Sequence, residues 1–231
     1  MGCIESKNNI DAPVDYSQLD QVQTFEFQLP FKRTMIHEFE TSLKKDAEGD
    51  ALTRDQLVHA VKGIKNWGEI EKADSLISRF LADPSFASDD DSAKVSIEKI
   101  MCFAVVQCAG PSKEKAAAFY RIFQDSDMPH IAASDKDIES NFPNVVLFNS
   151  NLVMDWATKE NKIDQPDSDT KEKWEDAAKG KMLDDFLDGV FGNDSKVKKE
   201  VFISKCASKE MAYIFDSSML RQKTKEALQD E

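Results

Sequence analysis

Apolar residues recur at intervals of three and four along most of this chain, and this spacing predicts amphipathic helices. The helical runs come in pairs, and each pair is separated by a short polar or acidic loop. No alternation of apolar and polar residues is long enough to predict a large sheet. The pattern therefore predicts an all-α fold built from four helix–loop–helix units.

One apolar residue lies near the end of each loop, as it does in EF-hand units, where it forms a short strand. These residues are Leu52, Val95, Ile131 and Val197. We expect Leu52 to pair with Val95 and Ile131 with Val197, which would join the units two by two. Thr53, Ser96 and Ser134 each precede a helical run and are the predicted N-caps. The sequence thus predicts two lobes of paired EF-hand-like units with minimal short β pairing between loops.

The domain boundaries follow from changes in composition along the chain. We expect a flexible N-terminal segment over residues 1–27, which includes a polar spacer from residue 8. The first lobe is predicted over residues 28–110, and the second over residues 111–215 with a polar insertion at 159–172. Residues 216–231 are predicted to form a charged C-terminal tail.

The loops lack most of the oxygen ligands that calcium requires at loop positions 1, 3, 5 and 12, and they lack the glycine at position 6. In the second loop, the register set by Val95 places Asp90 at position 3 but Lys99 at position 12. The third loop begins with Asp125 and Asp127 and then has Pro129. The first and fourth loops are poorer still. Asp90, Asp125 and Asp127 are therefore weak candidates only, and we expect no metal site.

The N-terminus matches the pattern for lipid modification. After removal of Met1, Gly2 becomes the N-terminus and Ser6 stands where the myristoylation pattern has Ser or Thr. Cys3 is placed to take a palmitate. The alternative is a chance match with an unmodified thiol. One myristate binds membranes only marginally, and the first thirty residues hold a single basic residue, Lys7.

Composition limits the remaining classes. A net charge of −13 disfavours nucleic acid as a partner, because nucleic acid binding needs a basic surface. No secretory signal or apolar run of membrane-spanning length is present. With the acyl sites, we expect the protein at the cytoplasmic face of a membrane, either the plasma membrane or an endolysosomal one. We expect no cofactor beyond covalent myristate and palmitate.

The sequence offers no catalytic set. His37, His59 and His130 fall in separate elements, and no glycine-rich phosphate loop is present, so we do not expect an enzyme. The four cysteines show no metal-ligand spacing, and Cys102, Cys108 and Cys206 are expected to be buried thiols. Large aromatic residues can be core residues or anchors for a partner. Trp156, Trp174 and Phe186 are the candidates to line a partner-binding groove.

The run from Lys94 to Phe123 resembles the linking region of EF-hand-like modules, in which a helix ends at a Gly-containing turn and Lys113-Glu-Lys opens the next. With the acylation site and Phe27-Gln-Leu-Pro30, the order is similar to the N-terminal half of myristoylated TLDc-domain proteins. The TLDc domain itself is absent. Association with the proton-pumping ATPase and lysosomal membranes is attributed largely to that domain. A more general resemblance to neuronal calcium sensors implies the same architecture.

These observations favour a membrane-anchored adaptor or scaffold that binds an unknown protein partner independently of calcium. Two alternatives stay open. One is an acylated calcium sensor with weak residual ion binding, and the other is a subunit of a larger membrane or cytoskeletal assembly.

Overall fold

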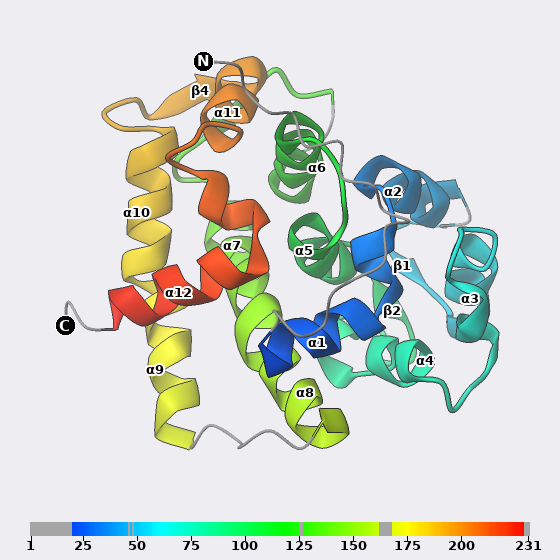
Figure 1. Cartoon of the computed structure of the whole chain (residues 1–231). Coiled ribbons are helices and arrows are strands. Elements are labelled where there is room, and N and C mark those ends of the chain that lie inside the picture. Colours follow the sequence, from blue (N-terminus) through cyan, green and yellow to red (C-terminus); the bar gives the residue numbers. More distant parts are fainter. Residues whose placement is uncertain (1–19, 46, 48, 125–126, 162–167, 229–231) are drawn as a thin grey trace, which may run out of the picture.

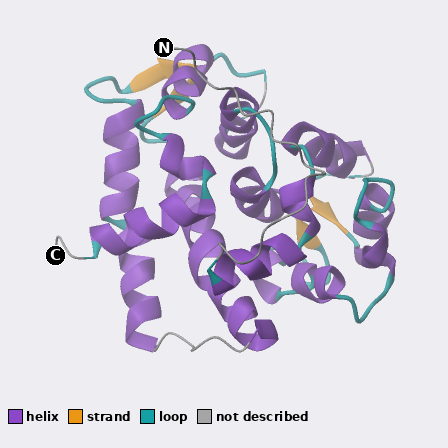
Figure 2. Ribbon diagram, in the orientation of Figure 1, coloured by secondary structure: helices purple, strands orange, loops and turns teal. Residues whose placement is uncertain are grey.

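The computed structural model describes residues 20–45, 47, 49–124, 127–161 and 168–228. Helices dominate this part of the chain, and its strands form two small antiparallel sheets (Figures 1 and 2). The predicted all-α fold is confirmed. No helix among the described residues is long and apolar enough to cross a membrane.

The first lobe contains two helix–strand–helix units joined by a sheet. The first unit consists of α2 (Ile36–Lys45), β1 (Ala51–Leu52) and α3 (Arg54–Val61), and the second of α4 (Leu76–Leu81), β2 (Val95–Ser96) and α5 (Ile97–Gln107). Leu52 pairs with Val95, as predicted from the sequence. Both predicted N-caps are confirmed, because Thr53 and Ser96 accept hydrogen bonds from the third residues of α3 and α5.

The second lobe repeats this arrangement. Its units are α6 (Ser112–Phe123), β3 (His130–Ala132) and α7 (Lys136–Leu147), followed by α9 (Ser168–Lys179), α10 (Lys181–Val190), β4 (Lys196–Lys198) and α11 (Lys199–Cys206). Ile131 pairs with Val197, again as predicted. The predicted cap of α7 was wrong by one residue, since Asp135 and not Ser134 accepts the bond from Asp137 N.

One apolar core runs through both lobes. Phe31, Phe80 and Phe103 form edge-on and tilted ring contacts in the first lobe, whereas Phe119 and Phe202 pack in the second. Helices α5 and α6 pack against each other across the junction of the lobes (Figure 1). The lobes are therefore halves of one packed body.

Two further helices, α1 (Gln21–Gln28) and α12 (Ser217–Ala227), lie in segments that were predicted as a flexible N-terminus and a charged tail. Helix α1 lies within the segment expected to be flexible, and a reciprocal Asp20–Gln23 capping box starts it. Helix α12 replaces the predicted charged tail. Each helix buries one narrow face, with Phe25 in α1 and Leu220 in α12 fully buried. A narrow face leaves most positions polar, which explains why the sequence pattern missed both helices.

The polar insertion predicted at 159–172 is also largely helical. A π-helical turn, η5 (Phe148–Leu152), continues α7 into α8 (Val153–Asn161), and α9 begins at Ser168. Residues 162–167 lie outside the described part of the chain. The sequence predicted only that this stretch is polar, and the structure adds that its described residues belong to α8 and α9.

Candidate functional site

The second loop holds a cation supplied by its own side chain. The Lys99 ammonium lies 2.9 Å from the carbonyl oxygen of Ala87 and 2.6 Å from Asp89 Oδ1. Backbone and carboxylate oxygens of this kind are ligands that calcium would use. The Lys99 ammonium therefore occupies two oxygens of this loop in the described structure.

The remaining metal candidates are dispersed. Asp90 and Asp127 are exposed in loops of different lobes, and Asp125 lies outside the described residues. In the third loop, the carbonyl of Met128 accepts a bond from the Tyr120 hydroxyl at 2.7 Å. Within the described part of the chain, no three His, Cys, Asp or Glu side chains are grouped so that they could hold a metal.

The aromatic groove candidates lie in the core. Trp156 is 7% exposed, Trp174 3% and Phe186 0%. The indole N–H of Trp156 donates to Asp83 at 2.8 Å, and Phe186 stacks on Phe142 with ring centroids 4.5 Å apart. These residues therefore do not line an open groove, and the sequence prediction was wrong on this point. Residue type alone does not distinguish a buried aromatic side chain from an anchor on the surface.

The remaining candidates from the sequence are three cysteines, which are buried, and the two acylation residues, which lie outside the described part of the chain. Cys102, Cys108 and Cys206 are buried, as expected. Burial raises the pKa of all three thiols, that of Cys108 to about 12, which suppresses the reactive thiolate. Gly2 and Cys3 lie outside the described residues.

A cleft of about 390 Å³ opens between the lobes, bounded by α2, α5, α6 and α7. Its floor is apolar and comes from α5 and α6. The floor residues are Ile97, Met101, Ala118, Ile122 and Phe123, all of them buried. The volume lies in the lower part of the usual range for ligand pockets, about 300–1,000 Å³.

The walls of the cleft carry charge. Glu40 of α2 accepts bonds from Arg121 of α6 at 2.6 Å and from Lys44 at 2.9 Å. Burial raises the pKa of Glu40, but the bonds from Arg121 and Lys44 outweigh burial, so its pKa is lowered. This ion pair therefore clamps the two lobes together at one wall.

Three more carboxylates face the cleft, Asp50, Glu98 and Asp137. The carbonyl oxygen of Asp50 accepts the Ile97 N–H at 2.9 Å, which holds this residue beside the start of α5. Burial, together with repulsion from Asp137 and Asp50, raises the pKa of Glu98. The sequence analysis missed this site, because its residues come from four helices and one loop.

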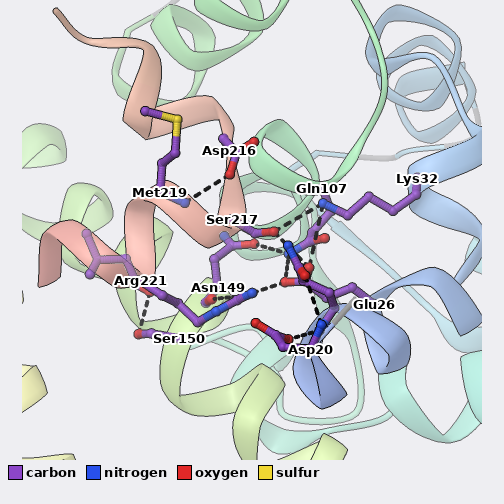
Figure 3. A network of polar contacts seen from close by, with 12 residues as sticks. Asp20, Glu26, Lys32, Gln107, Asn149, Ser150, Asp216, Ser217, Met219 and Arg221 are labelled. Carbon is purple, nitrogen blue, oxygen red and sulfur yellow. Dashed lines mark hydrogen bonds and ion pairs between the residues drawn. The ribbon is translucent and has the colours of Figure 1, made fainter. Parts of the chain in front are cut away.

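A second group of polar residues is buried around Glu26 of α1 (Figure 3). Its carboxylate accepts bonds from Arg221 of α12 at 2.6 Å, Ser217 at 2.8 Å and Gln107 of α5 at 2.9 Å. Burial raises the pKa of Glu26, but Lys32 and Arg221 outweigh this effect and lower it. The charge of Glu26 is thus fully compensated inside the protein.

The network continues into the π-helical turn. Asn149 of η5 accepts a bond from Gln107 at 2.8 Å and donates to the Val145 carbonyl at 2.8 Å. Arg221 also donates to the Asn149 carbonyl at 3.3 Å. A π-turn displaces one carbonyl from the regular helical ladder, which makes it available to a side chain. The network therefore ties α1, α5, η5 and α12 together.

Lys115 is a buried cation outside this network. Its ammonium donates to the carbonyl oxygens of Val106 and Phe215, each at 2.9 Å. Burial lowers its pKa to about 7, and the charge of Lys32 acts in the same direction. Its bonds fix the end of α5 against the segment before α12, so this residue is structural in the described fold.

A scan of protein-family models, a search of curated proteins and a search of solved structures each found no match to this chain.

We predict that Arg221→Met lowers the free energy of unfolding by about 3–5 kcal/mol, because it leaves the Glu26 carboxylate buried without its main ionic partner. Urea denaturation measures the change. The double variant Glu26→Gln, Arg221→Met should recover part of the loss. Lys179→Met, which breaks an exposed ion pair with Glu175, is the matched control and should change stability little. Equal effects of the Arg221 and Lys179 variants would contradict the role assigned to the network.

We predict that Lys115 makes stability rise with pH above about 7. Between its folded pKa of about 7 and the ordinary lysine value near 10.4, the unfolded chain binds a proton that the folded chain lacks. The stability of the wild type relative to Lys115→Met should therefore increase by up to about 1.4 kcal/mol per pH unit across this range. Urea denaturation at several pH values tests this. A difference that does not change with pH would refute it.

Proposed function

We propose that this protein is a lipid-anchored adaptor that holds a protein partner at the cytoplasmic face of a membrane, independently of calcium. The observation that carries the proposal is the N-terminal sequence, in which Gly2, Cys3 and Ser6 stand at acylation positions. Myristate on Gly2 and palmitate on Cys3 would supply the two chains that stable anchoring needs. The plasma membrane and endolysosomal membranes are the proposed locations.

Charge supports a requirement for both acyl chains. The chain has a net charge of −13, and anionic lipid would repel such a body. A polybasic segment, the usual substitute for a second chain, is not found near the N-terminus. Palmitate on Cys3 is therefore the proposed source of stable attachment.

Independence from calcium is supported by the second loop. Lys99 places an ammonium group against Ala87 and Asp89, so a divalent ion would have to displace a covalently attached cation. Removing that ammonium from its oxygens would leave a positive charge beside the ion. This arrangement favours an adaptor over a calcium sensor.

A non-enzymatic role agrees with the positions of the histidines. His37 lies in α2 and pairs with Glu114, whereas His59 lies in α3 and His130 in β3. The fold does not bring the three together. We therefore retain binding, and not catalysis, as the proposed activity.

The anchoring half of the proposal predicts that Gly2→Ala moves the protein from the membrane fraction to the cytosol, because alanine blocks myristoylation. Metabolic labelling with a myristate analogue and membrane fractionation measure this. Cys3→Ser should keep the myristate label but weaken retention, since a single chain binds with an association constant of only about 10⁴ per molar. Glu5→Gln, in the same segment, is the control. Unchanged fractionation of Gly2→Ala would overturn the proposal.

The calcium-independent half predicts no saturable calcium binding at micromolar concentrations, the range of sensor sites. Isothermal titration of the full chain with CaCl₂ measures this. Saturable micromolar binding would instead establish the alternative, an acylated calcium sensor. Recovery of the protein only in one stoichiometric complex would favour the other alternative, a subunit of a larger assembly.

A further inference from the structure

The cleft between the lobes carries negative charge that the described part of the chain does not neutralise. Its two cations, Lys44 and Arg121, both bind Glu40. Among the described residues, no ion pair joins Asp50, Glu98 or Asp137 to a lysine or arginine. That group of two cations and one carboxylate keeps one net positive charge, and the four carboxylates and two cations that line the cleft give it a formal net charge of −2.

All three carboxylates line the same cleft. Burial is the main cause of the raised pKa of Glu98, a hydrogen bond with Asn141 opposes it, and repulsion from Asp137 and Asp50 adds to it. Repulsion of this kind makes the empty cleft less stable than one that holds a positive charge. A bound cation would therefore reduce the electrostatic repulsion that acts on Glu98 in the empty cleft.

The floor of the cleft sets a second requirement. Buried apolar atoms of Ile97, Met101 and Ile122 line it, so a small hydrated cation would leave this surface unused. Lysine and arginine side chains combine an aliphatic stem with a charged head, and they commonly place the stem along apolar surface. The cleft has the matching order of surfaces, with an apolar floor and acidic residues at the rim.

We propose that this cleft binds a lysine or arginine side chain of a protein partner, with its stem on the apolar floor and its cationic head among Asp50, Glu98 and Asp137. The inference rests on the proposed adaptor function and specifies the chemistry of the partner.

Other occupants fit less well. The described residues bring no three carboxylate, thiol or imidazole groups into a geometry that could hold a metal ion. An amphipathic partner helix would need a continuous apolar groove, whereas the large apolar side chains exposed in the described chain, Met128, Val201 and Met219, lie on elements outside the cleft. A single long basic side chain uses both the depth and the charge of the site.

The test is a titration of the isotope-labelled full chain with four capped peptides, observed by NMR. The peptides share the frame Gly-Leu-Xaa-Leu-Gly, where Xaa is arginine, lysine, glutamine or norleucine. The arginine and lysine peptides should give saturable shifts at the amides of residues 97–101 and 118–124, with dissociation constants on the order of 1 mM. Norleucine, which keeps the stem without the charge, should bind at least about fivefold more weakly.

Two double variants separate a specific site from general attraction to an acidic protein. Glu98→Gln, Asp137→Asn removes two carboxylates from the cleft and should weaken arginine binding at least about fivefold. Asp184→Asn, Asp188→Asn removes two exposed carboxylates from α10 and should leave binding unchanged. All four positions are exposed, so both variants should fold, and circular dichroism verifies this.

Three outcomes would overturn the inference. They are equal weakening by both double variants, equal binding of all four peptides, and binding that does not saturate. Saturable shifts from the arginine and lysine peptides that avoid residues 97–101 and 118–124 would also overturn the inference, because they would place binding outside the cleft.

The same variants distinguish this inference from the proposed function. The cleft variant should remain in the membrane fraction, because anchoring depends on Gly2 and Cys3. If the peptides do not bind but Gly2→Ala still leaves the membrane fraction, only the inference about the cleft is refuted. If Gly2→Ala stays on the membrane, the anchoring proposal fails whatever the peptides show.

Discussion

The buried carboxylate of Glu26 is the constraint on which the closed arrangement of the chain depends. A charge in the protein interior costs several kcal/mol unless it is paired and hydrogen-bonded. Arg221, Ser217 and Gln107 supply those bonds, and they come from helices at the far end and in the middle of the sequence. Because these groups bond to one carboxylate from different helices, they join α1, α5 and α12 as one unit. The segment that follows the proposed lipid anchor is therefore joined firmly to the body.

Core packing and short β pairing stabilise the helix–loop–helix units. Two short sheets join the loops at the pairs Leu52–Val95 and Ile131–Val197, and a continuous aromatic core lies beneath them. In the second loop, Lys99 supplies the positive charge that the surrounding oxygens need. In the proposed adaptor, a loop that carries its own covalently attached cation would need no calcium ion to keep its shape.

The distribution of charge links the proposed anchor to the proposed binding site. Anionic lipid repels a body of net charge −13, so the proposed attachment would depend on acyl chains and not on the protein surface. In the cleft, Asp50, Glu98 and Asp137 line the same pocket as buried apolar residues of α5 and α6. There the geometry of the lobes concentrates the carboxylates beside a surface that suits an aliphatic stem. A protein of this kind would keep away from anionic lipid and bind a basic side chain of its partner.

The sequence by itself determined the features that depend on neighbouring residues. Helical periodicity and the caps Thr53 and Ser96 are encoded within a few residues of each position, and the structure confirms them. The strand pairs Leu52–Val95 and Ile131–Val197 join distant residues, but each was predicted from an apolar residue near the end of its loop, and the structure confirms both pairs. Only the tertiary structure decided that Trp156, Trp174 and Phe186 are core residues, that α12 is a helix, and that Arg221 meets Glu26 across 195 positions. The cleft also arises from the tertiary structure. The physical reason is that burial and long-range ion pairs depend on which surfaces the fold brings together, and no local pattern records that.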